Sequence, residues 1–195
     1  MRKAFPRYVA IAFLIAIVCT RMHSAEPYGV DLHGRVVRQF AGPGTHLVVL
    51  IFAASDCPIC NRYVPEIAHL DREYSARGVR VWWIFPNPED TASVVARHNR
   101  EFDIDGRTLL DPQQTLVHFA HITVTPEAAI FRVDDAGMHQ IYRGRIDDRY
   151  VAIGRERPQP SHHDLESALA AALADQPIPQ PAGPPVGCSV VFLQR

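Results

Sequence analysis

Long apolar runs alternate with helix-like segments along the chain, and this pattern predicts buried strands that are connected by helices. His46 to Phe52 and Val79 to Phe85 are nearly continuous runs of apolar residues. Runs of this length are typical of strands that are buried on both faces of a parallel sheet. Ahead of them, two short strand-like segments flank His33-Gly34 between Tyr28 and Phe40, which predicts a β-hairpin.

Helical spacing of apolar residues marks three segments around these strands. The first runs from Asn61 to Ser75, and Pro65 should kink it, because a proline inside a helix removes one hydrogen bond. The second runs from about Thr91 to Phe102. The third is expected to begin at Asp111-Pro112, where an N-cap residue precedes a proline, and to end near Ile122.

A hairpin and a helix are predicted towards the C-terminus. Ala128 to Val133 and Met138 to Tyr142 are strand-like segments on either side of a turn sequence. The residues from Ser161 to Asp164 resemble a capping box, and they precede a helix whose apolar stripe is Leu165, Leu169 and Leu173. Strands and helices that alternate, and then end in a hairpin and a helix, predict an α/β fold with mixed layers.

The first 25 residues have the layout of a secretory signal peptide. Basic residues precede an apolar core over residues 8–18, and the small residues Ser24 and Ala25 follow it. We expect cleavage after Ala25, which leaves a domain over residues 26–175 and a tail over residues 176–195. Retention of the segment as a short membrane anchor stays open, although its apolar core is short for a helix that spans a bilayer.

Composition and charge limit the domain count and the classes of partner to expect. Of the 195 residues, 47% are hydrophobic and 21% are charged, which is typical of one globular domain with short extra segments. Loss of residues 1–25 removes four of the 20 basic residues and no acidic one, so 16 basic residues (20 − 4) face 21 acidic ones. This mild acidity gives no reason to expect a DNA or RNA partner. Export to a periplasmic or other extracytoplasmic compartment would place the cysteines where disulfides persist.

The sequence Cys57-Pro58-Ile59-Cys60 follows the first buried strand and opens the first predicted helix. At a helix N-terminus, unpaired N–H groups and the helix dipole favour an anion, which lowers the pKa of a thiol there. A thiolate is the nucleophile of disulfide exchange. Cys57 is therefore the predicted attacking thiol, and Cys60 the resolving one. Pro58 suits the first helical turn, because that position needs no N–H group.

Two other interpretations of this motif stay open. The main one is a structural zinc site, but zinc usually takes four ligands and the chain has no second CxxC, so His118 and His121 would have to supply nitrogen ligands. The other is a static disulfide between Cys57 and Cys60, although so short a loop constrains little of the unfolded chain. The spacing and context favour a redox role, for which we expect neither a metal nor a cofactor.

Together these residues resemble the thioredoxin superfamily, and within it the exported redoxins of the alkyl hydroperoxide reductase and thiol-specific antioxidant group. The resemblance rests on Cys57 and Cys60 after a buried strand, on Pro65 at the family's helix-kinking position, and on Thr125-Pro126. It implies a thioredoxin-like α/β fold over about residues 28–173, in which helices flank a central mixed sheet. It also implies a cis bond between Thr125 and Pro126, beside the thiols, where the backbone pairs with a substrate polypeptide.

Three departures from the superfamily's pattern bear on activity. Asp56 replaces the tryptophan that usually precedes the first cysteine, and its carboxylate opposes ionisation of the neighbouring thiol. Ile51 replaces thioredoxin's buried acid, so proton transfer to Cys60 lacks an evident base. Ala54 stands where a peroxiredoxin has Thr or Ser three residues before its reactive cysteine, which leaves peroxide activation unsupported.

We therefore predict an exported thiol–disulfide oxidoreductase that acts on cysteine-containing protein substrates or on a redox partner protein. The first alternative is an antioxidant peroxidase, because the resemblance includes that group. The second is a copper-binding or copper-delivery module, because thiolates suit Cu(I) and His121 lies a few residues before Pro126. The copper-delivery relatives of the superfamily have a longer CxxxC spacing and a histidine at another place.

A third thiol, Cys188, lies beyond a proline-rich linker over residues 176–185. Such a linker is extended and semi-rigid. The apolar segment from Val186 to Leu193 would be costly to leave in water, so we expect it to dock on the domain as an added strand. Docking would carry Cys188 towards the active site, as a third redox thiol or as a shield for Cys57. A structural role as a buried apolar side chain and pairing with another chain stay open.

Overall fold

The computed structural model describes residues 28–193. The predicted signal peptide and its cleavage site lie outside the described residues. Within residues 28–193, no helix is both long enough and apolar enough to cross a membrane.

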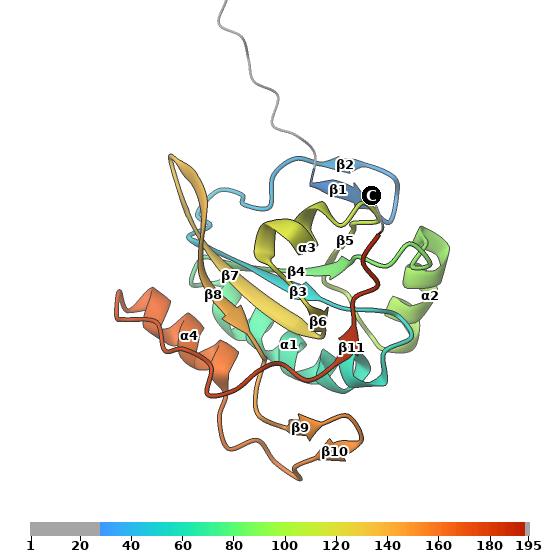
Figure 1. Ribbon diagram of the computed structural model, residues 1–195. Helices are drawn as coiled ribbons and strands as arrows, with labels where there is room; N and C mark the ends of the chain where they lie inside the picture. The colour runs from blue at the N-terminus through green and yellow to red at the C-terminus, as the bar shows by residue number, and fades with distance from the viewer. Residues whose placement is uncertain (1–27, 194–195) are drawn as a thin grey trace, which may run out of the picture.

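A mixed sheet forms the centre of the molecule (Figure 1). Its strands are β1 (Gly29–Asp31), β2 (Val36–Val37), β3 (Leu47–Phe52), β4 (Val79–Phe85), β5 (Arg107–Leu110), β7 (Glu127–Asp134) and β8 (Gly137–Gly144). The order across the sheet is β2-β1-β5-β4-β3-β7-β8. Strands β3, β4 and β5 are parallel to one another, and β7 runs antiparallel to β3. The predicted central mixed sheet and the predicted N-terminal hairpin, β1 and β2, are therefore confirmed.

Helices cover both faces of this sheet. They are α1 (Pro58–Ser75), α2 (Ala92–Glu101), α3 (Thr115–Ala120) and α4 (Asp164–Leu173). Every residue of β3 is buried, and successive residues alternate between two hydrophobic cores. One core includes side chains of α1, α2 and α4, and the other includes side chains of α3. The apolar run therefore lies at the centre of the fold because both of its faces are covered.

Two small two-stranded sheets complete the fold. One is a hairpin of β9 (Tyr150–Ala152) and β10 (Arg155–Glu156), which the sequence patterns did not predict. The other joins β6 (Val124–Thr125) to β11 (Cys188–Ser189) in the tail. Figure 1 shows the tail running from the end of α4 along the domain to β11, beside the start of α1. The expectation that the apolar tail docks as an added strand is confirmed, and its partner is β6 rather than the central sheet.

The predicted start of α3 at Asp111-Pro112 is wrong. The helix begins at Thr115, because Gln114 before it has a left-handed backbone with φ of 59°. Asp111 nevertheless stabilises the N-terminus of this helix from the preceding turn. Its carboxylate oxygens accept the N–H groups of Thr115, Leu116 and Val117, which the first turn leaves without intrahelical partners.

The capping box predicted at Ser161 is also wrong. Helix α4 begins at Asp164, its N-cap residue is His163, and no side chain caps it. The backbone N–H groups of Ser161 and His162 instead donate to the carboxylate of Asp148, at 2.6 and 3.0 Å. This segment is therefore held by a distant acid and not by a local cap. The apolar stripe of α4 is in the core as predicted, with Leu165 and Leu169 fully buried.

Candidate active site

Cys57 is the N-cap residue of α1, at the point where the chain leaves β3 and enters the helix. Its N–H group donates to the carbonyl oxygen of Ala54, which closes a tight turn, and Pro58 is the first residue of the helix. Cys60 lies in the first turn of α1. Both cysteines are inside the molecule, since Cys57 is 0% exposed and Cys60 is 1% exposed.

The bond between Thr125 and Pro126 is cis, as the family resemblance implied. The carbonyl oxygen of Thr125 lies 3.4 Å from Cys57 Sγ, so the loop around this bond packs directly on the first thiol. Two residues that are far apart in the sequence, Cys57 at the start of α1 and Thr125 in β6, therefore form one site.

The tail brings a third sulfur to this site. Cys188 lies opposite Thr125 in the antiparallel pair of β11 and β6. Its Sγ is 2.9 Å from Cys57 Sγ, within hydrogen-bond distance of it. The next residue but one, Val190, is buried in the core on the α3 side of the sheet. Docking of the tail therefore holds Cys188 against Cys57. The apolar segment from Val186 to Leu193 led us to expect this position for Cys188.

The three thiols have sharply different pKa values. The pKa of Cys57 is lowered from 9.0 to about 5, mainly by a hydrogen bond from Cys60 and also by one from Cys188, against the opposing effect of burial. Burial and the neighbouring Cys57 raise the pKa of Cys60. The same two causes raise the pKa of Cys188 to about 12. In the reduced protein, Cys57 is thus a thiolate that accepts hydrogen bonds from two protonated thiols.

Two buried acids that were not predicted from the sequence hold the backbone around the thiols. Asp90 accepts hydrogen bonds from the N–H and the hydroxyl of Ser55, in the turn before Cys57. Glu127 Oε2 accepts the N–H groups of Thr123 and Val124, and so fixes the β6 strand. The role of Asp90 could not be predicted locally, because Asp90 and Ser55 are 35 positions apart in the sequence. The role of Glu127 had one local indication, since Glu127 is a single charged residue directly after Thr125-Pro126 at the start of an apolar strand.

In the part of the chain that the structure describes, no group of three metal-ligand side chains combines a thiol with a histidine. Among residues 28–193, the only group of three ligands close enough to share an ion is Glu66, His163 and Glu166, and it contains no cysteine. His118, one of the histidines considered as a ligand, packs instead against the ring of Phe192 in the tail. The described residues therefore bring together the three cysteines and the Thr125–Pro126 loop, and not the sets of cysteines and histidines that the sequence suggested for zinc or copper.

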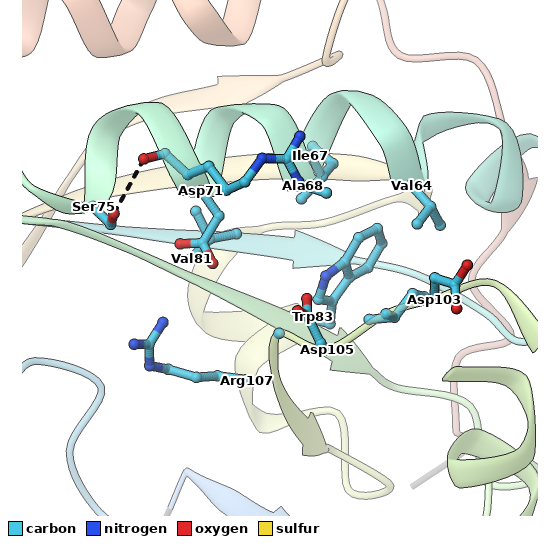
Figure 2. A pocket seen from close by; sticks show the side chains of 13 residues that line it. Val64, Ile67, Ala68, Asp71, Ser75, Val81, Trp83, Asp103, Asp105 and Arg107 are labelled. Atoms are coloured by element: carbon cyan, nitrogen blue, oxygen red, sulfur yellow. Dashed lines mark hydrogen bonds between the residues drawn. The ribbon is translucent and has the colours of Figure 1, made fainter. Parts of the chain in front are cut away.

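A groove of about 440 Å³ opens beside the thiols. It is lined by Cys188, by Pro58 and Ile59 of α1, and by residues of the β9–β10 hairpin: Tyr150, Ile153, Gly154 and Glu156. Neither Cys57 nor Cys60 is part of this lining. Figure 2 shows a separate pocket between α1 and β4, with Val64 and Trp83 among its side chains. No cysteine lines that second pocket, so the groove at Cys188 is the one that belongs to the site.

Comparison with known proteins agrees with this fold. The Redoxin family model matches residues 23–135. An uncharacterised conserved protein from Geobacillus kaustophilus is 24% identical, with a TM-score of 0.72 over 88% of this chain and 92% of that one. A hypothetical protein from Sinorhizobium meliloti is 20% identical, with a TM-score of 0.71 over 87% of this chain and 92% of that one. No curated protein matches the chain.

A third solved structure with this fold is that of a putative thiol:disulfide interchange protein DsbE from Chlorobium tepidum. It is 20% identical, with a TM-score of 0.54 over 77% of this chain and 99% of that one. The TM-scores of these three structures show a shared fold, which is the thioredoxin-like arrangement of a central mixed sheet between helices.

Proposed function

Because the chain belongs to the Redoxin family, we propose that it is an exported thiol–disulfide oxidoreductase whose redox pair is Cys57 and Cys60. One observation carries the proposal. Cys57 lies at the N-cap position of α1 with a pKa lowered to about 5, and the donor that lowers its pKa most is Cys60, the residue that would close a disulfide with it. A stabilised thiolate next to a protonated partner is the reduced form of an exchange site.

The chemistry runs through two sulfur exchanges. In the reducing direction, the Cys57 thiolate attacks one sulfur of a substrate disulfide, and the other substrate sulfur leaves as a thiolate. Cys60 then loses its proton to a released substrate thiolate and attacks Cys57 Sγ. The Cys57–Cys60 bond forms, the second substrate sulfur is released, and two electrons have passed from the protein to the substrate. The reverse sequence oxidises a substrate dithiol.

The surroundings of Cys57 favour this exchange over peroxide chemistry. Ala54, three residues before Cys57, is fully buried and offers no hydroxyl group to a peroxide. The backbone edge of β6 instead passes beside the thiol, and an extended chain pairs with it in the form of β11. A site that receives an extended chain next to a thiolate suits a polypeptide substrate, such as a cysteine-containing protein or a redox partner protein.

Turnover of a peptide with one internal disulfide, with dithiothreitol as the reductant, tests the proposal. Cys57→Ser and Cys60→Ser should each abolish turnover by a chain that still folds, and mass spectrometry of the oxidised protein should find the Cys57–Cys60 disulfide. Hydrogen peroxide consumption and metal content, measured on the same samples, test the peroxidase and copper alternatives. Turnover that survives Cys57→Ser would refute the assignment. Equilibration with glutathione buffers then gives the reduction potential, which sets the preferred direction.

A further inference from the structure

The docked tail encloses the redox pair and leaves Cys188 as the sulfur nearest to the outside. Cys57 is 0% exposed and Cys60 is 1% exposed, so neither offers a surface to a polypeptide. Cys188 is only partly buried, and it lines the groove formed with Ile59 and the β9–β10 hairpin. A substrate sulfur that enters the groove therefore meets Cys188 before it meets Cys57.

Contacts on both sides of Cys188 hold the tail in this position. On one side, the N–H of Ala182 donates to the Asp164 carboxylate at 3.0 Å. On the other side, Val190 is buried and its N–H donates to the carbonyl oxygen of Thr123 at 3.3 Å. Gly187 lies so close to Thr125 that an added Cβ would be 2.1 Å from the Thr125 carbonyl oxygen. These contacts hold the tail over Cys57 and Cys60 in the folded protein.

We propose that Cys188 is a third exchange thiol, which passes disulfide bonds between the buried Cys57–Cys60 pair and a cysteine-bearing polypeptide in the groove. This inference rests on the proposed function. It changes the exchange steps of that function in one respect: Cys188 stands between Cys57 and the substrate, so the mixed disulfide with the substrate forms on Cys188 rather than on Cys57.

When the oxidised protein acts on a substrate dithiol, the relay begins at Cys188 and ends with the substrate disulfide. Cys188 loses its proton and attacks Cys57 Sγ, so that the Cys57–Cys60 bond breaks, the Cys57–Cys188 bond forms, and Cys60 takes up the proton. A substrate thiolate attacks Cys188 Sγ and expels the Cys57 thiolate. The second substrate thiolate then closes the substrate disulfide and releases Cys188. Cys188 regains one substrate proton, the other goes to solvent, and an external disulfide later reoxidises the pair.

Geometry supports the first step of this route, and leaving-group chemistry supports the second. The sulfur atoms of Cys57 and Cys188 are 2.9 Å apart, so an approach of about 0.9 Å makes a disulfide bond. A thiol of lower pKa leaves faster in disulfide exchange. The hydrogen bond from Cys60, which lowers the pKa of Cys57 most, is still available when Cys57 is bonded to Cys188. Attack on Cys188 with Cys57 as the leaving group is therefore the favoured way to open their bond.

The groove fits an extended polypeptide segment. Its wall is mainly apolar and includes Ile59 of α1 together with Tyr150 and Ile153 of the hairpin. Ile153 is 73% exposed, and Val151 of β9 is also exposed. Large apolar side chains that stand in water next to a reactive sulfur are typical of a surface that binds a protein partner. The hairpin is thus placed to hold the residues that flank the substrate cysteine.

Disulfide mapping of the Cys60→Ser variant is the first test. The purified protein is incubated with oxidised glutathione, quenched with acid and mapped by mass spectrometry without reduction. The expected product is a Cys57–Cys188 disulfide, because Cys60 is no longer present to resolve it. A glutathione mixed disulfide on Cys57, with Cys188 left as a free thiol, would show that Cys57 exchanges directly and would overturn the relay.

A single-turnover rate measurement is the second test. Protein that carries the Cys57–Cys60 disulfide is mixed with a peptide that contains two cysteines, and closure of the peptide disulfide is followed. Cys188→Ser should slow closure about a hundredfold, the scale expected when a reacting group is lost from its position. Gly187→Ala should slow it about tenfold or more, because the added Cβ displaces β11 from Thr125.

The matched control is Ser189→Ala, an exposed position in the same strand whose side chain makes no hydrogen bond within residues 28–193, and it should react like the wild type. Thermal unfolding checks that each variant folds. If Gly187→Ala does not fold, the rate of Cys188→Ser alone decides the question. A rate that rises or stays unchanged in Cys188→Ser refutes the relay. The proposed function still stands in that case, provided that Cys57→Ser and Cys60→Ser abolish the reaction.

Discussion

Gln114 fastens the end of the tail to the domain through Val191, whose carbonyl oxygen accepts a hydrogen bond from Gln114 Nε2 at 2.7 Å. The other side-chain atom, Oε1, accepts the N–H of Leu193 at 3.1 Å. Gln114 is fully buried, and its backbone is left-handed, with φ of 59°. That conformation is unfavourable for a residue with a side chain, so the two hydrogen bonds to the tail offset a local cost.

The variant Gln114→Gly should release the tail end without disturbing α3. Glycine adopts the left-handed backbone freely, so the turn before α3 is kept while the buried side chain and its two hydrogen bonds to the tail are lost. Loss of buried hydrogen bonds costs about 1–3 kcal/mol, and amide hydrogens from Val190 to Leu193 should therefore exchange about tenfold faster or more. Gln113→Ala is the control, because Gln113 is exposed. Equal exchange rates in the two variants would contradict the role assigned to Gln114.

Glu127→Ala should disorder the strand that faces the thiols. The Glu127 carboxylate is buried and accepts hydrogen bonds from the backbone of Thr123 and Val124. Removal leaves those N–H groups without their partner and costs about 1–3 kcal/mol of unfolding free energy. Because β6 carries β11, disulfide turnover should fall along with stability. Urea unfolding and turnover assays measure the two effects, and Glu89→Ala, at an exposed acid before α2, is the control.

The strands that could be predicted from the sequence are those whose own residues carry the pattern. The run over β3 is apolar because both faces of the strand are buried at every residue, and β4 is buried at every residue except Arg80 and Trp82, which are half-buried. Strand β5 was missed because its four residues, which begin with Arg107, are too few to show a period. Its extended form depends on pairing with β4 on one side and β1 on the other.

Only those parts of the site that depend on neighbouring residues in the sequence could be predicted. The spacing of Cys57 and Cys60 after an apolar run was enough to place both at the start of a helix. The register of Cys188 against Thr125 was out of reach, because it depends on contacts along the whole docked tail. Gly187 did give a hint, since a glycine next to a cysteine permits close backbone approach, but nothing local identified Thr125 as the neighbour.

Export depends on the N-terminal segment, which lies outside the described residues. The full chain, expressed in a Gram-negative bacterium, should be recovered outside the cytoplasm with Glu26 as its first residue. The variant Leu14→Arg puts a charge in the apolar core of the signal and should keep the protein in the cytoplasm. Cell fractionation and N-terminal sequencing decide the matter. Recovery of uncleaved protein in the membrane fraction would favour the anchor instead.

The hydrogen bonds to Cys57 predict a ranked set of pKa changes. In the reduced wild type, the ultraviolet absorbance of the thiolate should titrate near pH 5, because Cys60 and Cys188 both donate to Cys57. Cys188→Ala removes the weaker donor and should raise the pKa of Cys57. Cys60→Ala removes the stronger donor and should raise it further. A larger effect of Cys188→Ala than of Cys60→Ala would contradict this order of donors.

The same thiolate should make the stability of the reduced protein depend on pH. The pKa of Cys57 is about 5 in the folded state and 9.0 as the ordinary value, so between these limits the unfolded chain binds one more proton than the folded one. The free energy of unfolding should therefore rise with pH from 5 towards 9, and the gain should be lost as the pH falls through 5. Urea unfolding of the reduced wild type at several pH values measures this slope, with Cys57→Ala as the reference. If the two proteins have the same slope, Cys57 is not ionised in the folded state, and the exchange mechanism loses its nucleophile.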